Sequence, residues 1–526
     1  MTLRPLLDIG VDDERFGALI QAVRDADGAD VHMSAAIRPY LLAALVSSAD
    51  GLGERPALIV APDDIAARDL ARDLAAYLAP QRVRYYPSRG TGYASHLAPP
   101  PHLVGLRIAA LDSLSEGSAV VVASAAALAE AVPDTSLRPA GLTLRKGEEV
   151  DLGEVGDRLV EAGYERTDQV EERGQFAIRG DILDVFGATE DRAARVELFG
   201  DEIEQIRWFS TFTQRSLGDA ELIELAPAAE LGSEYRELAE LVLTDYPPAA
   251  DAKRSTSADE DSERPDLAEL LPLDSFRAPL DLIPDDTAIL VAAAGEMESA
   301  LHDQWEDATA AMHSSDASRL YVNVSDALDE RAALRISDSD AGQELSFRAQ
   351  APSSAARSIG EAEKQLEKEL RSGYRVVVVF EHRGEAERAR YNLQRVEAAF
   401  LGGAPPPDEP ALFFAEAALS DGFVSPELKL AVIPFRRLVH RRRAAAPAPS
   451  RGRLAAFTDL RVGDHVVHED HGIARFAGFE TKTVGGVTRD YLELEYRGSD
   501  RVFAPTDQLA KITRYVGTGG APPCRP

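Results

Sequence analysis

Two arginines, Arg179 and Arg195, stand on either side of an apolar run in a chain that is otherwise strongly acidic. The stretch 175–208 has the sequence QFAIRGDILDVFGATEDRAARVELFGDEIEQIRW, and Phe199 follows the second arginine closely. A guanidinium makes bidentate, charge-assisted contacts with carboxylates, and a nearby aromatic ring can supply an apolar anchor, so these residue types are typical of protein–protein hot spots. The alternative is local: both arginines could form ion pairs within their own sheet, with Asp181, Glu197 or Glu202.

The position where a nucleotide-binding loop would be expected lacks the residues that hold phosphate. A phosphate loop needs glycines, whose backbone N–H groups surround the phosphates, and a Lys followed by Ser or Thr. Residues 31–46, VHMSAAIRPYLLAALV, contain neither Gly nor Lys. Residues 287–297, TAILVAAAGEM, have alanines where an Asp-Glu pair would hold magnesium. We therefore expect no nucleotide hydrolysis and no cofactor in this chain.

Other constellations that could carry catalysis or bind a metal are weak. The sequence HEDHG at 468–472 places two histidines three residues apart, a spacing that does not put both on one face of a strand, and no third ligand is evident. A structural turn is the favoured interpretation. No G-x-S-x-G elbow occurs, and the single cysteine, Cys524, has no nucleophile context. We expect no catalytic residue and no metal site.

Length and charge limit the possible classes of protein. The 526 residues suggest about three or four domains. No apolar stretch is long enough for a membrane span, and the start, MTLRPLLDIGVDDERF, has no signal-peptide core, so we expect a cytoplasmic protein. The net charge of −32 opposes bulk attraction to nucleic acid and favours protein partners. Any DNA contact would need a local basic patch such as 435–453, although a solvated tether explains that stretch equally well.

The elements that must position these residues follow from apolar periodicity. Strand patterns at 56–62, 82–87 and 118–124 alternate with helix patterns, which predicts a parallel sheet covered by helices. After about residue 139 a helix is followed by three short alternating runs, which predict an antiparallel meander in a small insertion domain. A buried strand at 287–293 returns to the α/β pattern, and 249–266 is acid-rich and expected to be disordered.

The second half of the chain predicts two further units. A helix at 360–371, a strand at 374–380 and a helix at 383–399 indicate a second α/β domain. The last unit has short strand patterns and predicts a compact β barrel or sheet, in which the Thr-rich stretch 479–486 could form an exposed edge. The predicted divisions are 1–138 and 226–337 for the first α/β domain, 139–225 for the insertion, 338–438 for the second α/β domain, 439–456 for an Arg/Pro-rich linker and 457–526 for the β domain.

Three stretches resemble one known family, the bacterial transcription-repair coupling factors (Mfd), over the N-terminal half of its members. RGDILDVF, RVELFGDEIEQIRWF and TQRSL are similar to the insertion domain that this family shares with the excision-repair protein UvrB. The stretch 466–517, from VVHEDHG to KITRYVG, looks like the family's RNA-polymerase-interacting domain, which is related to CarD-type regulators. The stretch 84–111, RYYPSRGTGYASHLAPPPHLVGLRIAAL, resembles the family's first domain.

The resemblance implies a fold, partners and site residues. It implies a degenerate UvrB/helicase-like parallel-sheet domain, an α+β insertion domain that binds UvrA, an α/β spacer domain and a small Tudor/CarD-like β barrel that binds the β subunit of RNA polymerase. The implied UvrA-binding residues are Arg179, Arg195 and Phe199. For the polymerase we expect the surface Ile473–Val484, through the residues Ile473, Arg475, Phe476, Phe479 and Lys482.

Departures from the family pattern limit the function that the resemblance implies. The motor lobes of the family, which carry ATP and magnesium, have no counterpart before Pro526, and the ending GTGGAPPCRP leaves the expected pattern, as a truncation or frameshift would. The resemblance therefore implies an adaptor in transcription-coupled nucleotide-excision repair, which binds UvrA and polymerase and contacts DNA only weakly. Two alternatives stay open: a UvrB-like ATP-dependent DNA-repair helicase, and a CarD-like transcription regulator.

Overall fold

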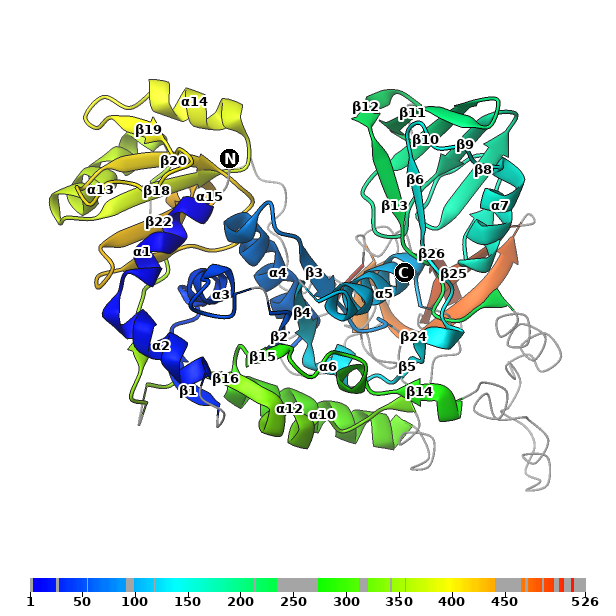
Figure 1. Cartoon of the computed structure of the whole chain (residues 1–526), viewed down its shortest axis with the longest axis horizontal. Helices are drawn as coiled ribbons and strands as arrows, with labels where there is room; N and C mark the ends of the chain where they lie inside the picture. Colours follow the sequence, from blue (N-terminus) through cyan, green and yellow to red (C-terminus); the bar gives the residue numbers. More distant parts are fainter. Residues whose placement is uncertain are drawn as a thin grey trace. The chain divides into compact units, whose positions relative to one another are not determined.

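The chain divides into two compact units, one formed by residues 1–89 and 99–440 and the other by 90–98 and 441–526. Figure 1 traces the elements along the chain. The computed structural model describes residues 3–24, 28–53, 55–90, 99–117, 119–211, 214–233, 273–311, 320–340, 343–354, 356–439, 465–468, 472–484, 487–495, 501–505 and 512–514.

The first unit is built on a seven-stranded parallel sheet with the order β17-β1-β16-β15-β2-β4-β3. Its central strands are continuous apolar runs, such as ALIVA in β2, because helices cover both faces and every side chain is buried. The predicted strands at 56–62, 82–87, 118–124 and 287–293 are all present. The strands are β1 (Ala29–Met33), β2 (Ala57–Ala61), β3 (Val83–Tyr86), β4 (Val120–Ser124), β15 (Ala288–Val291), β16 (Ala332–Ser337) and β17 (Ser346–Phe347).

Helices enclose this sheet in two apolar cores. One face packs against helices that include α1, α3 and α4, and the other against helices that include α6 and α10. Asp63 starts α4 because its carboxylate accepts the N–H of Ala66 at 2.8 Å, a side-chain N-cap. The helices are α1 (Leu7–Val11), α2 (Glu14–Arg24), α3 (Arg38–Ser47), α4 (Asp64–Leu78), α5 (Pro101–Ser115), α6 (Ala125–Leu128), α10 (Ala294–Ala311) and α12 (Ser325–Arg331).

Short elements connect these layers. They are the 3-10 helices η1 (Arg4–Leu6), η2 (Thr135–Leu137), η3 (Leu273–Ser275) and η4 (Pro279–Asp281), and the two-stranded pair β5 (Val132–Pro133) and β14 (Phe276–Arg277).

The insertion domain is a six-stranded sheet with one helix packed on it. Strands β8 to β12 pair antiparallel in sequence order, so the predicted meander is confirmed, while β7 joins β8 in parallel. Asp151 caps α7 by accepting the N–H groups of Gly153 and Glu154. The elements are α7 (Leu152–Glu161), β7 (Glu165–Arg166), β8 (Gln175–Arg179), β9 (Ile182–Val185), β10 (Ala193–Phe199), β11 (Glu202–Phe209) and β12 (Ser216–Ala220), with β6 (Leu142–Arg145) and β13 (Leu222–Leu225) as a second, two-stranded sheet.

The second α/β part is a five-stranded sheet with the order β19-β20-β18-β22-β21. The predicted helix 383–399 is wrong in its second half, because α14 stops at Tyr391. The carboxylate of Glu363 accepts the backbone N–H groups of residues 394–396 at 2.5–3.2 Å, which ends helical pairing there. The elements are α13 (Ile359–Arg371), β18 (Arg375–Phe380), α14 (Arg383–Tyr391), β19 (Ala398–Phe400), β20 (Leu412–Glu416), β21 (Phe423–Ser425), β22 (Leu430–Pro434) and α15 (Phe435–Leu438).

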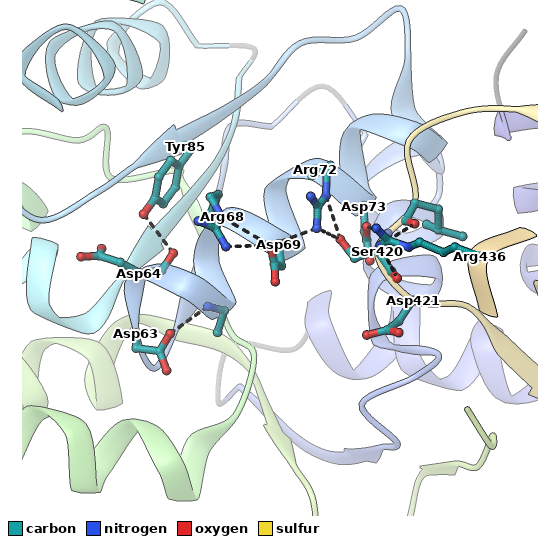
Figure 2. Close-up of polar contacts among 12 residues, drawn as sticks. Asp63, Asp64, Arg68, Asp69, Arg72, Asp73, Tyr85, Ser420, Asp421 and Arg436 are labelled. Carbon is teal, nitrogen blue, oxygen red and sulfur yellow. Dashed lines mark hydrogen bonds and ion pairs between the residues drawn. The ribbon is translucent and has the colours of Figure 1, made fainter. Parts of the chain in front are cut away.

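The two α/β sheets share one apolar core. Side chains of β18 and β22 pack in the same buried cluster as α1, α3 and α4, and the rings of Tyr40 and Phe423 lie 5.0 Å apart. Polar contacts complete this junction, where Arg72 and Asp73 on α4 reach Ser420 (Figure 2). Arg436 donates to the carbonyl of Ser420 at 2.6 Å. Residues 338–438 are therefore packed on the first sheet through a continuous core.

The second unit holds a five-stranded antiparallel sheet with the order β26-β25-β24-β23-β27. Val466, Ala474, Phe476 and Leu494 are buried within it. Within the parts of this unit that the structure describes, no pairing joins the end strands β26 and β27, so the expected barrel is not confirmed. The strands are β23 (His465–His468), β24 (Gly472–Val484), β25 (Val487–Glu495), β26 (Arg501–Pro505) and β27 (Ile512–Arg514).

Candidate partner-binding site

Arg179 and Arg195 both bind one carboxylate, that of Asp184. Arg195 donates from Nε to Oδ1 at 2.6 Å and from Nη2 to Oδ2 at 2.8 Å, so its contact is bidentate. Arg179 donates from Nη2 to Oδ2 at 2.7 Å. The local alternative named Asp181, Glu197 and Glu202 as partners. The structure confirms local pairing but places it on a different carboxylate.

The register of three strands explains this convergence. Asp184 on β9 lies directly opposite Ala177 on β8 and Arg195 on β10, so the two neighbours of Asp184 are on the same sheet face. Arg179 is two residues beyond Ala177 on the same strand and reaches Asp184 diagonally, which suits a long side chain. A charged residue inside the apolar run ILDVF, between strands that each carry an arginine, is the signal that could have identified Asp184 from sequence.

The three charged residues differ strongly in exposure. The side chain of Asp184 is 2% exposed, that of Arg195 19% and that of Arg179 53%. Arg195 also donates to Gln214 at 3.1 Å, and its guanidinium lies 4.8 Å from the centre of the Phe209 ring. The hydrogen bond to Asp184 raises the pKa of Arg195, which holds its charge. Arg195 is therefore engaged on several sides, whereas Arg179 keeps much of its guanidinium in solvent.

Phe199 ends β10 and stands out from the surface. Its side chain is 81% exposed, although it directly follows Leu198, which is buried in the domain's core. A register shift between Glu197 and Leu198 marks the local irregularity of β10, next to the turn that Gly200 makes with φ of 66°. A phenylalanine this exposed contributes little to the packing of its own domain.

A buried charge cluster holds the segment that follows the insertion domain against the first α/β domain. Arg107 on α5 donates to Glu130 at 2.7 Å and to Glu230 at 3.0 Å, and Arg89 also donates to Glu230 at 2.9 Å. Burial alone would raise the pKa of Glu230, but the charges of Arg89 and Arg107 outweigh it and lower that pKa. The four charges sum to zero and each carboxylate binds at least one of the two guanidiniums, which offsets the cost of burying the cluster.

Close backbone packing reinforces this attachment. Gly105 on α5 faces Ala188, and a Cβ added at Gly105 would lie 2.7 Å from the Cβ of Ala188. The ring of His102 also contacts the carbonyl of Ala188, at 2.9 Å from Nδ1. The arginine-bearing domain is thus held against α5 at short range.

The turn after β1, where a phosphate loop would lie, is occupied by contacts within the chain. The N–H of Ser34 donates to the carbonyl of Phe347 and the N–H of Ile37 to that of Ser34, both at 3.0 Å. Arg38 pairs with Asp338 at 2.5 Å. The N–H groups of Ser34 and Ile37 and the guanidinium of Arg38 are thus engaged within the chain.

The residues expected to meet polymerase lie on β24, the longest strand of the second unit. Over Gly472–Arg475 the strand pairs with both β23 and β25, and beyond this segment its recorded pairing is with β25. Among the described residues, no second strand pairs with β24 between Phe476 and Val484, where the described part of the strand ends. Arg475 is exposed and donates to Glu495 at 2.5 Å, but Phe476 is 1% exposed and packs inside the sheet. Ile473, Phe479 and Lys482 lie on the same strand.

Several expectations fall wholly or partly outside the described residues. The acid-rich insert 249–266, the linker 439–456 beyond its first residue and the final stretch from 515 are among them, as are residues 469–471 of the HEDHG motif. His468 of that motif pairs with Gly472 across an antiparallel connection. Among the side chains that are described, no group of three or more potential metal ligands comes together. No helix in the described part of the chain combines the length and apolar character that a membrane span needs.

Two family models match the chain. The model of the UvrB interaction domain covers residues 142–231, which hold Arg179, Arg195, Phe199 and the anchoring Glu230. The model described as CarD-like/TRCF RID domain covers 460–516, which hold all five strands of the second unit.

Several relatives match most of the length of the chain. The proteins named transcription-repair-coupling factor from Bacillus subtilis and Mycobacterium bovis are 26% and 30% identical to it, each over 89% of this chain. The protein of the same name from Staphylococcus haemolyticus is 24% identical over 98% of the chain. The chain spans less than half the length of these relatives, 43–47%. The two domain matches and the matches along the chain together fit an N-terminal half of a transcription-repair coupling factor of the Mfd family.

Proposed function

We propose that this chain is the adaptor part of a transcription-repair coupling factor, which links stalled RNA polymerase to UvrA in nucleotide-excision repair. The observation that carries the proposal is the exposed pair Arg179 and Phe199 inside the range matched by the UvrB interaction domain. A half-exposed guanidinium and an 81% exposed phenylalanine on one small sheet are the residue types of an interface hot spot.

The polymerase side of the proposal rests on the second unit. The range 460–516 matches the CarD-like/TRCF RID domain, and β24 has a free edge beyond Arg475 among the described residues. An edge strand has unpaired backbone groups, so a partner can bind by adding a strand. We propose the β subunit of polymerase as this partner and 473–484 as the contact, with Phe476 supporting the strand from inside. A small barrel formed by these strands is also part of the proposal.

The chain itself is proposed to bind no nucleotide or metal, and ATP and magnesium are assigned to motor lobes that the matched range does not include. The contacts of Ser34, Ile37 and Arg38 within the chain support this. DNA contact is proposed to be weak. Two arginines of the basic stretch, Arg436 and Arg437, already bind the carbonyl of Ser420 and the carboxylate of Asp421. Such an adaptor would act in the bacterial cytoplasm.

Binding of the full chain to purified UvrA tests the proposal. Biolayer interferometry should give a saturable signal that Phe199→Ala and Arg179→Ala each weaken about 30-fold, which corresponds to about 2 kcal/mol at a hot spot. Leu217→Ala and Arg192→Ala are matched controls, because both residues are exposed in the same domain. Their affinities should equal that of the wild type. Wild-type chain that fails to bind UvrA, or test variants that bind as well as the controls, would refute the assignment.

A further inference from the structure

We propose that Asp184 is a positioning residue: it fixes Arg195 and Arg179 so that the sheet presents one uncompensated guanidinium, toward the same end of the sheet as Phe199, to a partner that supplies a carboxylate and an apolar pocket. The inference rests on the proposed UvrA-docking function and concerns how that surface is built. Asp184 is buried, so it acts through the two arginines and does not touch the partner.

The cluster of Asp184, Arg179 and Arg195 has a net charge of one positive unit. One buried carboxylate binds two guanidiniums, and Arg195 takes both of its oxygens in a bidentate contact. Arg179 shares Oδ2 through Nη2, and no other hydrogen bond of its guanidinium is recorded within the described part of the chain. The remaining N–H groups of Arg179, on a side chain that is 53% exposed, can therefore bind a second carboxylate.

The position of Arg179 relative to Phe199 follows from the register. Arg179 on β8 lies opposite Ile182 on β9, which in turn lies opposite Glu197 on β10. Phe199 is two residues further along β10, so both proposed contact residues lie toward the same end of the sheet. Without Asp184, Arg179 would sample many rotamers, and the partner would have to order it at an entropic cost.

A neutral replacement of Asp184 separates positioning from simple electrostatics. Asp184→Asn removes a negative charge from the face, so if charge alone mattered, a carboxylate-bearing partner would bind the variant more tightly. Positioning predicts the opposite, because the amide cannot accept the bidentate contact and still order Arg179. Glu197→Gln is the matched control, since it removes a negative charge from the same strand as Arg195, where Glu197 pairs with Arg207.

The experiment measures UvrA binding of the full-length wild-type, Asp184→Asn and Glu197→Gln chains by interferometry, at low and physiological salt. We expect Asp184→Asn to lose about tenfold or more in affinity, mainly through a faster off-rate, while Glu197→Gln equals or exceeds the wild type. Asp184→Asn that binds as tightly as wild type, while Arg179→Ala loses binding, would overturn the positioning role and leave the docking site standing. Wild-type chain without UvrA binding would instead refute the proposed function.

A double variant covers the case in which Asp184→Asn does not fold. Asp184→Leu combined with Arg195→Met removes both partners of the buried pair, a change that cores generally tolerate, and keeps Arg179. A folded double variant with far-UV circular dichroism like that of the wild type should bind UvrA about tenfold more weakly. Full affinity in this folded variant would show that Arg179 needs no support and would contradict the proposal.

Discussion

Asp73 on α4 accepts a hydrogen bond from the backbone N–H of Ser420 at 2.6 Å, and this contact joins the two α/β sheets of the first unit. Asp73 is 4% exposed, and burial raises its pKa to about 6, although the N–H of Ser420 and the charge of Arg72 oppose the shift. A carboxylate with a raised pKa destabilises the native state wherever it is ionised. The junction is therefore sensitive to pH at this residue.

The first prediction concerns Asp73→Asn. Because the native pKa lies above the unfolded value, native protein binds this proton more tightly, and the Asp73 contribution to stability falls as pH rises from about 4 through about 6. The amide oxygen of Asn can still accept from Ser420. At pH 7.5 the variant should be more stable than wild type by about 1–3 kcal/mol, with the gain shrinking toward pH 4.5. Urea unfolding at both pH values measures this, and an equal difference at the two pH values would contradict the burial of a charged Asp73.

The second prediction concerns stability at the docking surface. Arg195→Ala leaves the buried carboxylate of Asp184 with one partner, so the free energy of unfolding should fall by about 2–3 kcal/mol. Local ion pairing was one of the two interpretations of these arginines from sequence, and the bidentate contact with Asp184 gives Arg195 such a role. Phe199→Ala, by contrast, should leave stability within about 0.5 kcal/mol, because the ring is exposed. Chemical denaturation of both variants measures these values, and a fully stable Arg195→Ala chain would contradict the structural role of the pair.

The third prediction concerns nucleotide. With Ser34, Ile37 and Arg38 engaged inside the chain, we expect no ATP hydrolysis above background and no saturable binding of a fluorescent ATP analogue at micromolar concentration. A coupled-enzyme assay and fluorescence anisotropy measure the two quantities. Turnover that is abolished by a substitution within 31–46 would favour the helicase alternative.

The fourth prediction concerns the edge of β24. A proline at Thr481 removes a backbone donor from the strand, so strand addition by the polymerase β subunit should be lost. Residues 456–526 carry nine Lys and Arg against ten Asp and Glu, so this association should depend little on salt. Pull-down of polymerase by full-length Thr481→Pro measures the loss, with Thr481→Val as the control that keeps the donor. Retained binding by a folded proline variant would place the contact on another surface.

The pattern of apolar residues predicted the helices and strands well where the buried side chains follow one regular spacing. The run ALIVA and the cap at Asp63 specify β2 and α4 locally, because their apolar runs and capping residue act within a few positions. The same reasoning placed a helix over 383–399, and it failed because Glu363, far away in sequence, binds the backbone at 394–396. When a side chain from another helix binds the backbone N–H groups of a segment, the sequence of that segment itself gives no sign that the helix will end there.

The docking residues illustrate the same limit. Arg179, Arg195 and Phe199 could be selected from their types and from the family resemblance, but their different roles could not. Strand register brings Asp184 between the two arginines, and a register shift beside Phe199 accompanies its exposure. Register depends on the pairing of whole strands, so sequence patterns predict that a sheet forms before they predict which side chains meet.

The adaptor role is tested most directly by asking whether the chain joins RNA polymerase and UvrA in one complex. RNA polymerase is immobilised through a subunit other than β, purified UvrA is added with or without the full-length chain, and the UvrA retained is quantified. The account predicts that UvrA is retained only with the chain, and that Arg179→Ala combined with Phe199→Ala abolishes UvrA retention while the chain itself stays bound to polymerase. UvrA retained equally without the chain, or equally by the double variant, would contradict the claim that this chain joins the two partners through these residues.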